Sequence, residues 1–364
     1  MPPSRLSPHR PMHFRLGRML GKGAYGAVHE ALLESGASVA VKRVDLGRCA
    51  RGPGKDSRLA FNVESEVLRN LPSHPHVVAF LASEAPRGGQ GEALIWMECV
   101  SGGSVSGVLK TYGAMREDTA GRFAAHVLSG LVFLHSNRVV HRDVKPANLL
   151  VTVCGTVKIG DFGSACVVDG EGGKAKGIAG TPNYMAPEIF RMVNNPTGGE
   201  AQGDGTYDCK ADVWSLGMTL IEMLTAHPPY SELSNPFAVM FHIARHPTPP
   251  LPPSASSRAL AFLARCLERC PEARSSSLDL CTDPFLPPQL GRLNRDAGWQ
   301  LPPPHPCYSC DKMRRGSLLA AYRGIHPPPP PRNLSPPLPL VAAAQDHPAQ
   351  QWGGQFRRAP SAPQ

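Results

Sequence analysis

Residues 141–148 read HRDVKPAN and place three side chains suited to phosphoryl transfer on one short segment. The carboxylate of Asp143 could orient a hydroxyl group and accept its proton. The ammonium of Lys145 could neutralise charge on a transferred phosphoryl group, and the carboxamide of Asn148 could bind a metal ion. Residue types in this order and at this spacing predict a loop at which a phosphoryl group is transferred to a hydroxyl group.

A second metal ligand follows from the next segment. Residues 149–151 and 157–159 are short apolar runs on either side of a Cys-Gly turn, which predicts a hairpin of two strands. A hairpin brings its ends together, so Asn148 and Asp161 are expected to lie side by side. Two such oxygen ligands suit Mg²⁺, which takes few protein ligands and keeps phosphates and water. The alternative is a surface asparagine and an unrelated loop aspartate.

The run from Leu20 to Val28 reads LGKGAYGAV and has the form G-x-G-x-x-G-x-V. A dinucleotide-binding fold would require a strand before the glycines and a helix after them. Here strand-like residues resume at Val28, and residues 39–42 (VAVK) supply the next strand. We therefore expect a glycine loop that lies close to phosphates, with Lys42 pairing with the α- and β-phosphates. The glycines of this loop are Gly21, Gly23 and Gly26.

Lys42 needs a carboxylate partner, and the next helical segment offers Glu64 and Glu66. Residues two apart on a helix point in different directions, so only one of them can face Lys42. We favour Glu64, which lies beside the apolar stripe and four residues before Leu68, and interpret Glu66 as a solvated surface charge. The stripe that predicts this helix consists of Leu59, Val63, Val67 and Leu71.

Together these motifs resemble the eukaryotic protein kinase family across about residues 13–288. Residues 180–188 (GTPNYMAPE) are similar to the family's substrate-docking segment, and residues 212–217 (DVWSLG) to the start of its large central helix. The family usually pairs the A-P-E glutamate with an arginine, here Glu188 with Arg274. The resemblance implies an α+β, two-lobed fold with a small antiparallel β lobe carrying one main helix and a larger, mainly α lobe.

The resemblance also implies ATP and Mg²⁺ as cofactors. Asn148 and Asp161 would hold the metal, and Asp143, Lys145 and Thr181 would form the catalytic group. Other residues would bind the nucleotide, although the apolar ones could instead be ordinary core. Met97 would be the gatekeeper, the Glu98 carbonyl and Val100 amide would pair with adenine, and Val28, Ala40 and Leu150 would sandwich its ring.

Lys145 and the Gly-Thr-Pro run at 180–182 resemble serine/threonine kinases, with the Thr181 hydroxyl bonding to Asp143 and Lys145. Residues 98–105 and 181–189 are most similar to the mitogen-activated protein kinase kinase kinase group. Calcium/calmodulin-dependent and NIMA-related kinases are the alternative groups. Two alternative functions belong to other classes of protein. One is a pseudokinase scaffold, which would be expected to lack Lys42, Asp143 or Asp161. The other is an interaction protein that works through its tail.

Composition agrees with an enzyme that needs no membrane span. The 364 residues contain no run of eighteen apolar residues, and the first residues lack the apolar core of a signal peptide. Ten scattered cysteines favour a reducing compartment, so we expect a cytoplasmic protein with possible nuclear access. The net charge of +9 includes no dense basic run, so nucleic acid is not expected as a partner.

Three parts are expected: a loose N-terminus at 1–12, a kinase-like domain at 13–288 with a Gly-rich insertion at 194–206, and a Pro-rich, disordered tail at 289–364. In the tail, Pro327, Pro330 and Arg332 have the P-x-x-P-x-R spacing that could dock an SH3-type domain. The alternative is a solvated tail without a partner. The expected substrate is a serine or threonine of another protein.

The segment from Ala165 to Gly180 contains no Ser, Thr or Tyr. Many kinases order this loop by phosphorylating a hydroxyl that then pairs with the arginine of the H-R-D motif, here Arg142. We therefore expect basal activity that does not depend on phosphorylation of this loop. The alternative is that Thr181 itself is phosphorylated.

Overall fold

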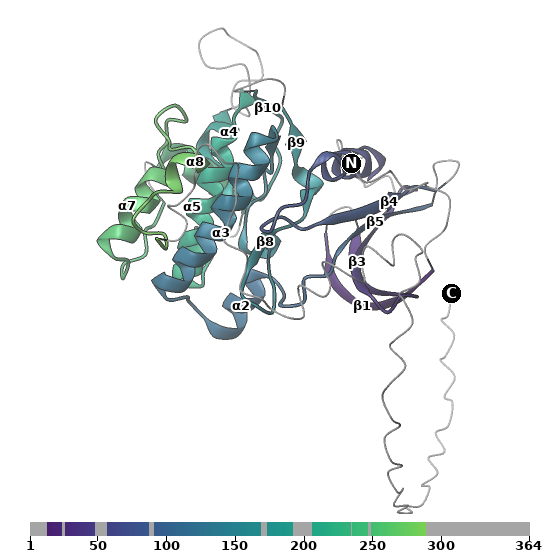
Figure 1. The fold of residues 1–364 in the computed structure, drawn as a ribbon. Coiled ribbons are helices and arrows are strands. Elements are labelled where there is room, and N and C mark those ends of the chain that lie inside the picture. The colour runs from purple at the N-terminus through teal and green to yellow at the C-terminus, as the bar shows by residue number, and fades with distance from the viewer. Residues whose placement is uncertain are drawn as a thin grey trace, which may run out of the picture. The chain divides into compact units, whose positions relative to one another are not determined.

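The computed structural model describes residues 13–23, 26–47, 57–86, 91–168, 173–191, 206–233, 235–246 and 249–288. The expected N-terminal segment 1–12 and the tail 289–364 lie outside these residues, as does the insertion 194–206 except for Thr206. The described residues form an antiparallel sheet in the N-terminal part and a mainly helical C-terminal part (Figure 1). The predicted two-lobed α+β fold is confirmed.

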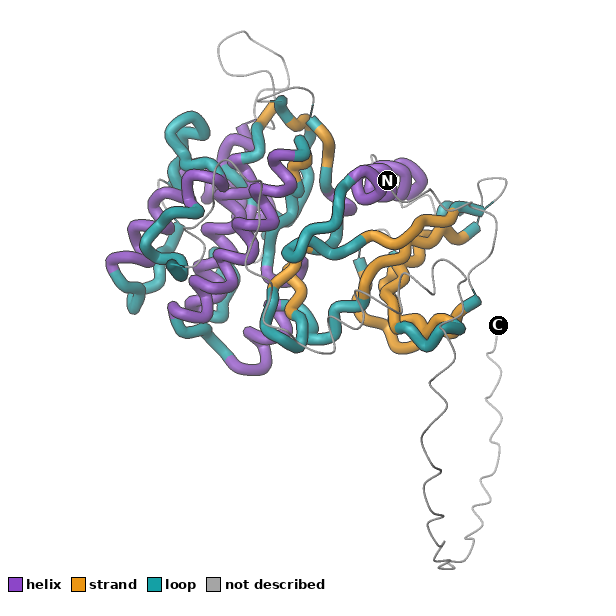
Figure 2. The backbone as a smooth tube through the Cα atoms, in the orientation of Figure 1, coloured by secondary structure: helices purple, strands orange, loops and turns teal. Residues whose placement is uncertain are grey.

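The N-terminal sheet has the strand order β1-β2-β3-β5-β4, and each neighbouring pair is antiparallel. Figure 2 shows most of the strand residues, in orange, gathered in one part of the molecule and most of the helices, in purple, in the other. Its register places Lys42 opposite Val28 on one side and opposite Ile95 on the other, while Ala40 lies opposite Met97. The pairing therefore gathers residues predicted to bind the nucleotide. The strands are β1 (Phe14–Lys22), β2 (Ala27–Leu33), β3 (Ser38–Asp45), β4 (Phe80–Glu84) and β5 (Glu92–Glu98).

Successive side chains of a strand point to opposite faces, so the sheet divides its apolar residues between two clusters. A small cluster contains Val39, Val41 and Trp96, with the Phe14 ring meeting Trp96 edge-on at a centroid distance of 4.7 Å. Alternate residues such as Ala40 belong to the main core, which also includes the helical part. The lysine at the end of VAVK consequently projects on the side away from the small cluster.

Helix α1 (Ser57–Asn70) contacts β3 and β4 and the turn that follows Asp161. The predicted helix is present, but the predicted stripe is wrong at two of its positions. The side chains of Leu59 and Val63 are 62% and 36% exposed, whereas Phe61 and Glu64 are buried. Two sets of residues at helical spacing overlap in this segment. The contacts of the helix with the sheet bury the set that contains Phe61, Glu64 and Leu68.

The C-terminal part is built around α5, which lies among the other helices in Figure 1. Its residues are buried along almost the whole length of the helix. A helix that is apolar on every side belongs in a core, and α3 and α7 pack against it. Within the described residues, no helix has the length and apolar character needed to cross a bilayer. The helices are α2 (Val105–Tyr112), α3 (Glu117–Ser136), α4 (Pro187–Arg191), α5 (Lys210–Thr225), α6 (Pro236–Arg245), α7 (Ser257–Cys266) and α8 (Ser277–Leu280).

Short antiparallel strand pairs carry the segments between these helices. The hairpin predicted after Asn148 is present, with a turn in which Gly155 has a φ of 75° that favours glycine. A further pair joins residues 175–176 to residues 206–207, which the sequence did not predict. The pairs are β6 (Val139–Val140) with β9 (Cys166–Val167), β7 (Leu149–Val151) with β8 (Val157–Ile159), and β10 (Ala175–Lys176) with β11 (Thr206–Tyr207).

Candidate active site

The three residues predicted to be catalytic form a closed set of hydrogen bonds. The Thr181 hydroxyl donates to Oδ1 of Asp143 at 2.8 Å, and Nζ of Lys145 donates to Oδ2 of Asp143 at 2.7 Å. Lys145 also donates to the Thr181 oxygen at 2.5 Å. The contacts expected for Thr181 are therefore present, although its catalytic role stays a prediction.

Asp212, in the first turn of α5, holds the backbone of the loop that carries Asp143. The fully buried Asp212 carboxylate accepts the backbone N–H groups of His141 and Arg142, both at 2.8 Å, and faces Nε2 of His135 at 3.0 Å. Arg142 has a φ of 67°, an uncommon conformation that these bonds help to hold. Burial alone would raise the pKa of Asp212, but hydrogen bonding and charge from His135 outweigh it and lower that pKa.

The predicted metal ligands lie at the two ends of the β7–β8 hairpin. The N–H of Gly160 donates to the carbonyl of Asn148 at 2.9 Å, so the hairpin brings Asn148 next to the residue before Asp161. The carboxamide nitrogen of Asn148 donates to the carbonyl and the carboxylate of Asp143, at 2.8 and 2.9 Å. Its oxygen is consequently the atom suited to a cation.

Asp161 supplies the anionic member of this pair. Its Oδ1 accepts from Nζ of Lys42 at 3.0 Å, and its side chain is 46% exposed. Burial raises the pKa of Asp161, but the adjacent Lys42 ammonium outweighs that effect and lowers it below the usual value. One ionised carboxylate and one amide oxygen form a donor set that fits Mg²⁺ with phosphates and water completing the shell.

Lys42 and Glu64 form the most buried ion pair of this region. The ammonium lies 2.7 Å from both carboxylate oxygens, and the side chains are 6% and 2% exposed. Burial would lower the pKa of Lys42, but Glu64 and Asp161 outweigh it and raise that pKa, so the amine is charged. The pairing expected for Glu64 is present, and Glu66 is exposed, as expected.

The three glycines of the Gly-rich loop serve different purposes. A Cβ added to Gly26 would lie 2.0 Å from the carbonyl oxygen of Arg43, so the packing of the sheet itself requires glycine there. Among the residues that the structure describes, a Cβ added to Gly21 would meet no atom within 4 Å, and one added to Gly23 would meet only the Gly26 carbonyl oxygen, at 3.8 Å. The packing of the described residues thus gives no reason for glycine at Gly21 and Gly23, whereas a closely approaching phosphate would.

The residues predicted to contact adenine belong to one apolar cluster, the main core. Within it, Ala40 and Met97 are buried, while Val28, Val100 and Leu150 are partly buried. Leu20 lies on the exposed strand β1 beside the loop glycines. The structure brings the five apolar side chains of the main core, but not Leu20, into a single cluster, and their contacts with a nucleotide stay predictions.

Sequence reasoning missed the role of Lys158. Its side chain is 5% exposed, and Nζ donates to Oε1 of Glu98 at 2.6 Å. The same carboxylate oxygen accepts the N–H of Ala79 at 2.7 Å. Lys158 precedes Asp161 by three residues, so this ion pair ties the predicted adenine-binding segment to the strand that carries a predicted metal ligand. The one sequence signal for burial of this side chain is the apolar run 157–159 (VKI), in which Lys158 stands.

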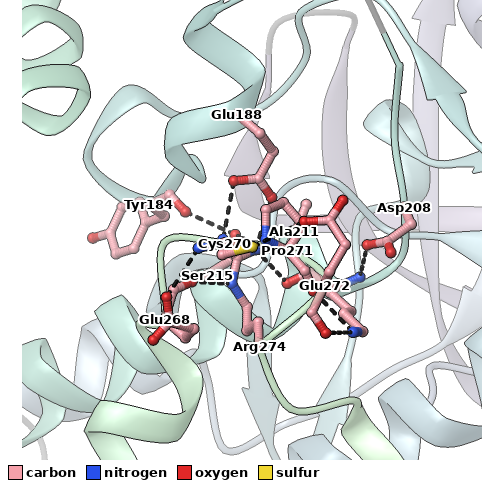
Figure 3. Close-up of polar contacts among 11 residues, drawn as sticks. Tyr184, Glu188, Asp208, Ala211, Ser215, Glu268, Cys270, Pro271, Glu272 and Arg274 are labelled. Atoms are coloured by element: carbon pink, nitrogen blue, oxygen red, sulfur yellow. Dashed lines mark hydrogen bonds and ion pairs between the residues drawn. The ribbon is translucent and has the colours of Figure 1, made fainter. Parts of the chain in front are cut away.

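The expected pair between Arg274 and Glu188 is present (Figure 3). Nη1 and Nη2 of the arginine lie 2.7 and 3.0 Å from the two carboxylate oxygens, and the Arg274 side chain is fully buried. Its Nε also donates to the carbonyl of Glu268 at 2.7 Å. The A-P-E end of the substrate-docking segment is thereby fixed to the helical part.

Comparison with known proteins agrees with this geometry. The protein kinase domain family matches residues 14–286. The chain is 35% identical over 289 residues to mitogen-activated protein kinase kinase kinase A of Dictyostelium discoideum, covering 79% of this chain and 28% of that protein. It is 38% identical over 277 residues to mitogen-activated protein kinase kinase kinase 6 of Homo sapiens, covering 74% and 20%.

Mitogen-activated protein kinase kinase kinase 3 of Arabidopsis thaliana is 35% identical over 286 residues, covering 76% of this chain and 41% of that protein. The chain belongs to the protein kinase family. It is similar to the mitogen-activated protein kinase kinase kinase group, as the motifs predicted. It spans less than half the length of these relatives.

Proposed function

We propose that this chain transfers the γ-phosphoryl group of ATP to serine or threonine hydroxyls of other proteins, in a signalling role like that of a mitogen-activated protein kinase kinase kinase. The observation that carries this proposal is the hydrogen-bonded set of Asp143, Lys145 and Thr181 beside Asn148. It combines a general base, a cation and a hydroxyl slot next to oxygen ligands for a metal.

Each residue has a distinct part in this proposal. Lys42, held by Glu64, would bind the α- and β-phosphates, and the Gly-rich loop would cover them with backbone. Asp143 would orient the acceptor hydroxyl and take its proton, while Lys145 would neutralise developing charge. Mg²⁺, when held by Asn148 and Asp161, would supply further neutralisation of the phosphates. Most of the rate enhancement would come from positioning and charge.

The pseudokinase alternative gains no support from the site. Lys42, Asp143 and Asp161 are all present, and each takes part in the contacts described above. The proposed compartment is the cytoplasm, with nuclear access. An SH3-type domain remains the proposed partner of Pro327, Pro330 and Arg332, which lie outside the described residues. Phosphotransfer measured with and without residues 289–364 would separate an enzyme from a protein that acts only through its tail.

Substitution of Asp143 tests the proposed function. Asp143→Asn should abolish transfer of label from radiolabelled ATP to casein while leaving nucleotide binding nearly intact, because Asp143 acts on the hydroxyl. Asp118→Asn is the matched control, since that carboxylate is 86% exposed and outside the site. Equal transfer by Asp143→Asn and by the unaltered protein would refute the assignment of Asp143 and of the reaction.

A further inference from the structure

The pairing of β10 with β11 connects the segment between Asp161 and Glu188 to the chain just before α5. Ala175 lies opposite Tyr207 in this pair, and both side chains are buried. This part of the segment is the one that lacks Ser, Thr and Tyr. The described part of the segment is thus held by backbone pairing at a place where a phosphorylated side chain is not available.

Tyr207 adds side-chain contacts to this pairing. The residue is 3% exposed, and its hydroxyl donates to the carbonyl of Gly177 at 3.2 Å. Burial raises the pKa of this hydroxyl, and the charge and hydrogen bonding of the nearby Arg142 guanidinium act against that rise. Gly177 has a φ of 80°, which favours glycine, so the carbonyl is presented by a tight turn. One buried hydroxyl therefore joins the segment to the arginine of the H-R-D motif.

Arg142 transmits these contacts to the catalytic loop. Its Nε donates to the carbonyl of Ser164, and its backbone N–H is held by Asp212, five residues after Tyr207. Its own carbonyl is so close to Gly180 that a Cβ there would lie 2.3 Å away. Gly180 immediately precedes Thr181. Asp212 thus holds the backbone of Arg142, and Tyr207 acts on its side chain through charge and hydrogen bonding.

We propose that Tyr207 is a positioning residue for phosphotransfer, taking the place of an activation-loop phosphate by joining Arg142 to the segment that carries Thr181. This inference rests on the proposed kinase function and deepens it. A phosphate would bring charge and several acceptor oxygens. Here the neutral hydroxyl of Tyr207 and the short pairing of β10 with β11 connect Arg142 to the segment that carries Thr181. This connection needs no covalent modification.

Tyr207→Phe in the full chain tests the proposal, because it removes the hydroxyl and keeps the ring. Losing a buried hydrogen bond should reduce kcat/KM for casein by about fivefold to tenfold, with the KM for ATP changed by less than about twofold. The matched control is Tyr112→Phe, whose ring is 81% exposed, and it should behave like the unaltered protein. Backbone amides around Gly177 should exchange hydrogen faster in Tyr207→Phe than in Tyr112→Phe.

Unchanged kcat/KM and unchanged exchange in Tyr207→Phe would overturn the proposal. A general loss, in which nucleotide binding and melting temperature fall together with transfer, would show a merely structural tyrosine and would also overturn it. The proposed function fails separately: it fails if the unaltered protein transfers no label to casein or another protein acceptor. Transfer by the unaltered protein with an unaffected Tyr207→Phe would reject only the role of Tyr207.

Discussion

Arg274 and Glu188 are 86 residues apart in the chain and form a two-pronged ion pair in the interior of the helical part. The guanidinium also lies over the Trp214 ring, 5.2 Å from its centroid. Nη1 also donates to the carbonyl of Lys210 at 3.0 Å, so the pair fixes the end of the substrate-docking segment to the first residue of α5. Removing one partner of a buried ion pair destabilises the folded protein, because the remaining charge is left without compensation.

Removing Arg274 should therefore destabilise the domain strongly. We expect Arg274→Ala to lower the free energy of unfolding by about 3–5 kcal/mol, because it leaves the Glu188 carboxylate, which is only 10% exposed, without its counter-charge. Urea unfolding followed by tryptophan fluorescence would measure this. The control is Arg116→Ala, whose side chain is 87% exposed and which should change stability little. Similar unfolding midpoints for the two variants would contradict the prediction.

Lys158 should influence nucleotide affinity without touching the nucleotide. Lys158→Met keeps a long side chain but removes the ion pair with Glu98, so the segment predicted to hold adenine loses its tie to the strand before Asp161. We expect the Kd for ATP to rise by about tenfold, the equivalent of one lost charged hydrogen bond. The exposed Lys110→Met serves as control. Titration with a fluorescent ATP analogue gives both constants, and equal affinities would exclude this role.

The pair of His135 with Asp212 should make stability depend on pH on the alkaline side. Burial alone would lower the pKa of His135, but hydrogen bonding to Asp212 outweighs it and raises the pKa to about 9. An unfolded histidine titrates near pH 6.5. The folded state therefore binds this proton more tightly, and the stabilisation is fully present below about pH 6.5 and lost as the pH rises through about 9.

His135→Gln provides the measurement. The difference in free energy of unfolding between the unaltered protein and the variant should be largest at about pH 6 and should shrink by about 3 kcal/mol near pH 10, which follows from the size of the shift. Taking the difference removes the titration of other groups common to both proteins. A difference that stays constant over this range would show that folding does not shift the pKa of His135.

Phosphatase treatment should leave basal activity largely unchanged. The segment from Ala165 to Gly180 offers no hydroxyl, and the Thr181 hydroxyl is already bonded to Asp143 and Lys145. Initial rates on casein would be compared after incubation with active and with heat-inactivated phosphatase. A large loss of activity, traced by mass spectrometry to a phosphate between Ala165 and Glu188, would prove this prediction wrong and would favour phosphorylation of Thr181.

Local patterns sufficed to predict several elements of the fold and several side-chain contacts of the candidate site. The β7–β8 hairpin follows from two apolar runs and a Cys-Gly turn, whose partners are a few residues apart. The family resemblance supplied the two-lobed architecture and the residues around Asp143. The choice of Glu64 over Glu66 also agrees with the structure, although two of the residues used to argue it, Leu59 and Val63, are exposed.

Tertiary structure alone decided the contacts that hold the site together. The sequence did not reveal that Lys158 would meet Glu98, that Asp212 would hold His141 and Arg142, or that Tyr207 would reach Gly177. The partners in these contacts are 30 to 71 residues apart. Periodicity and turn chemistry report only on neighbours along the chain, whereas these contacts depend on how strands and helices pack after the chain has folded back on itself.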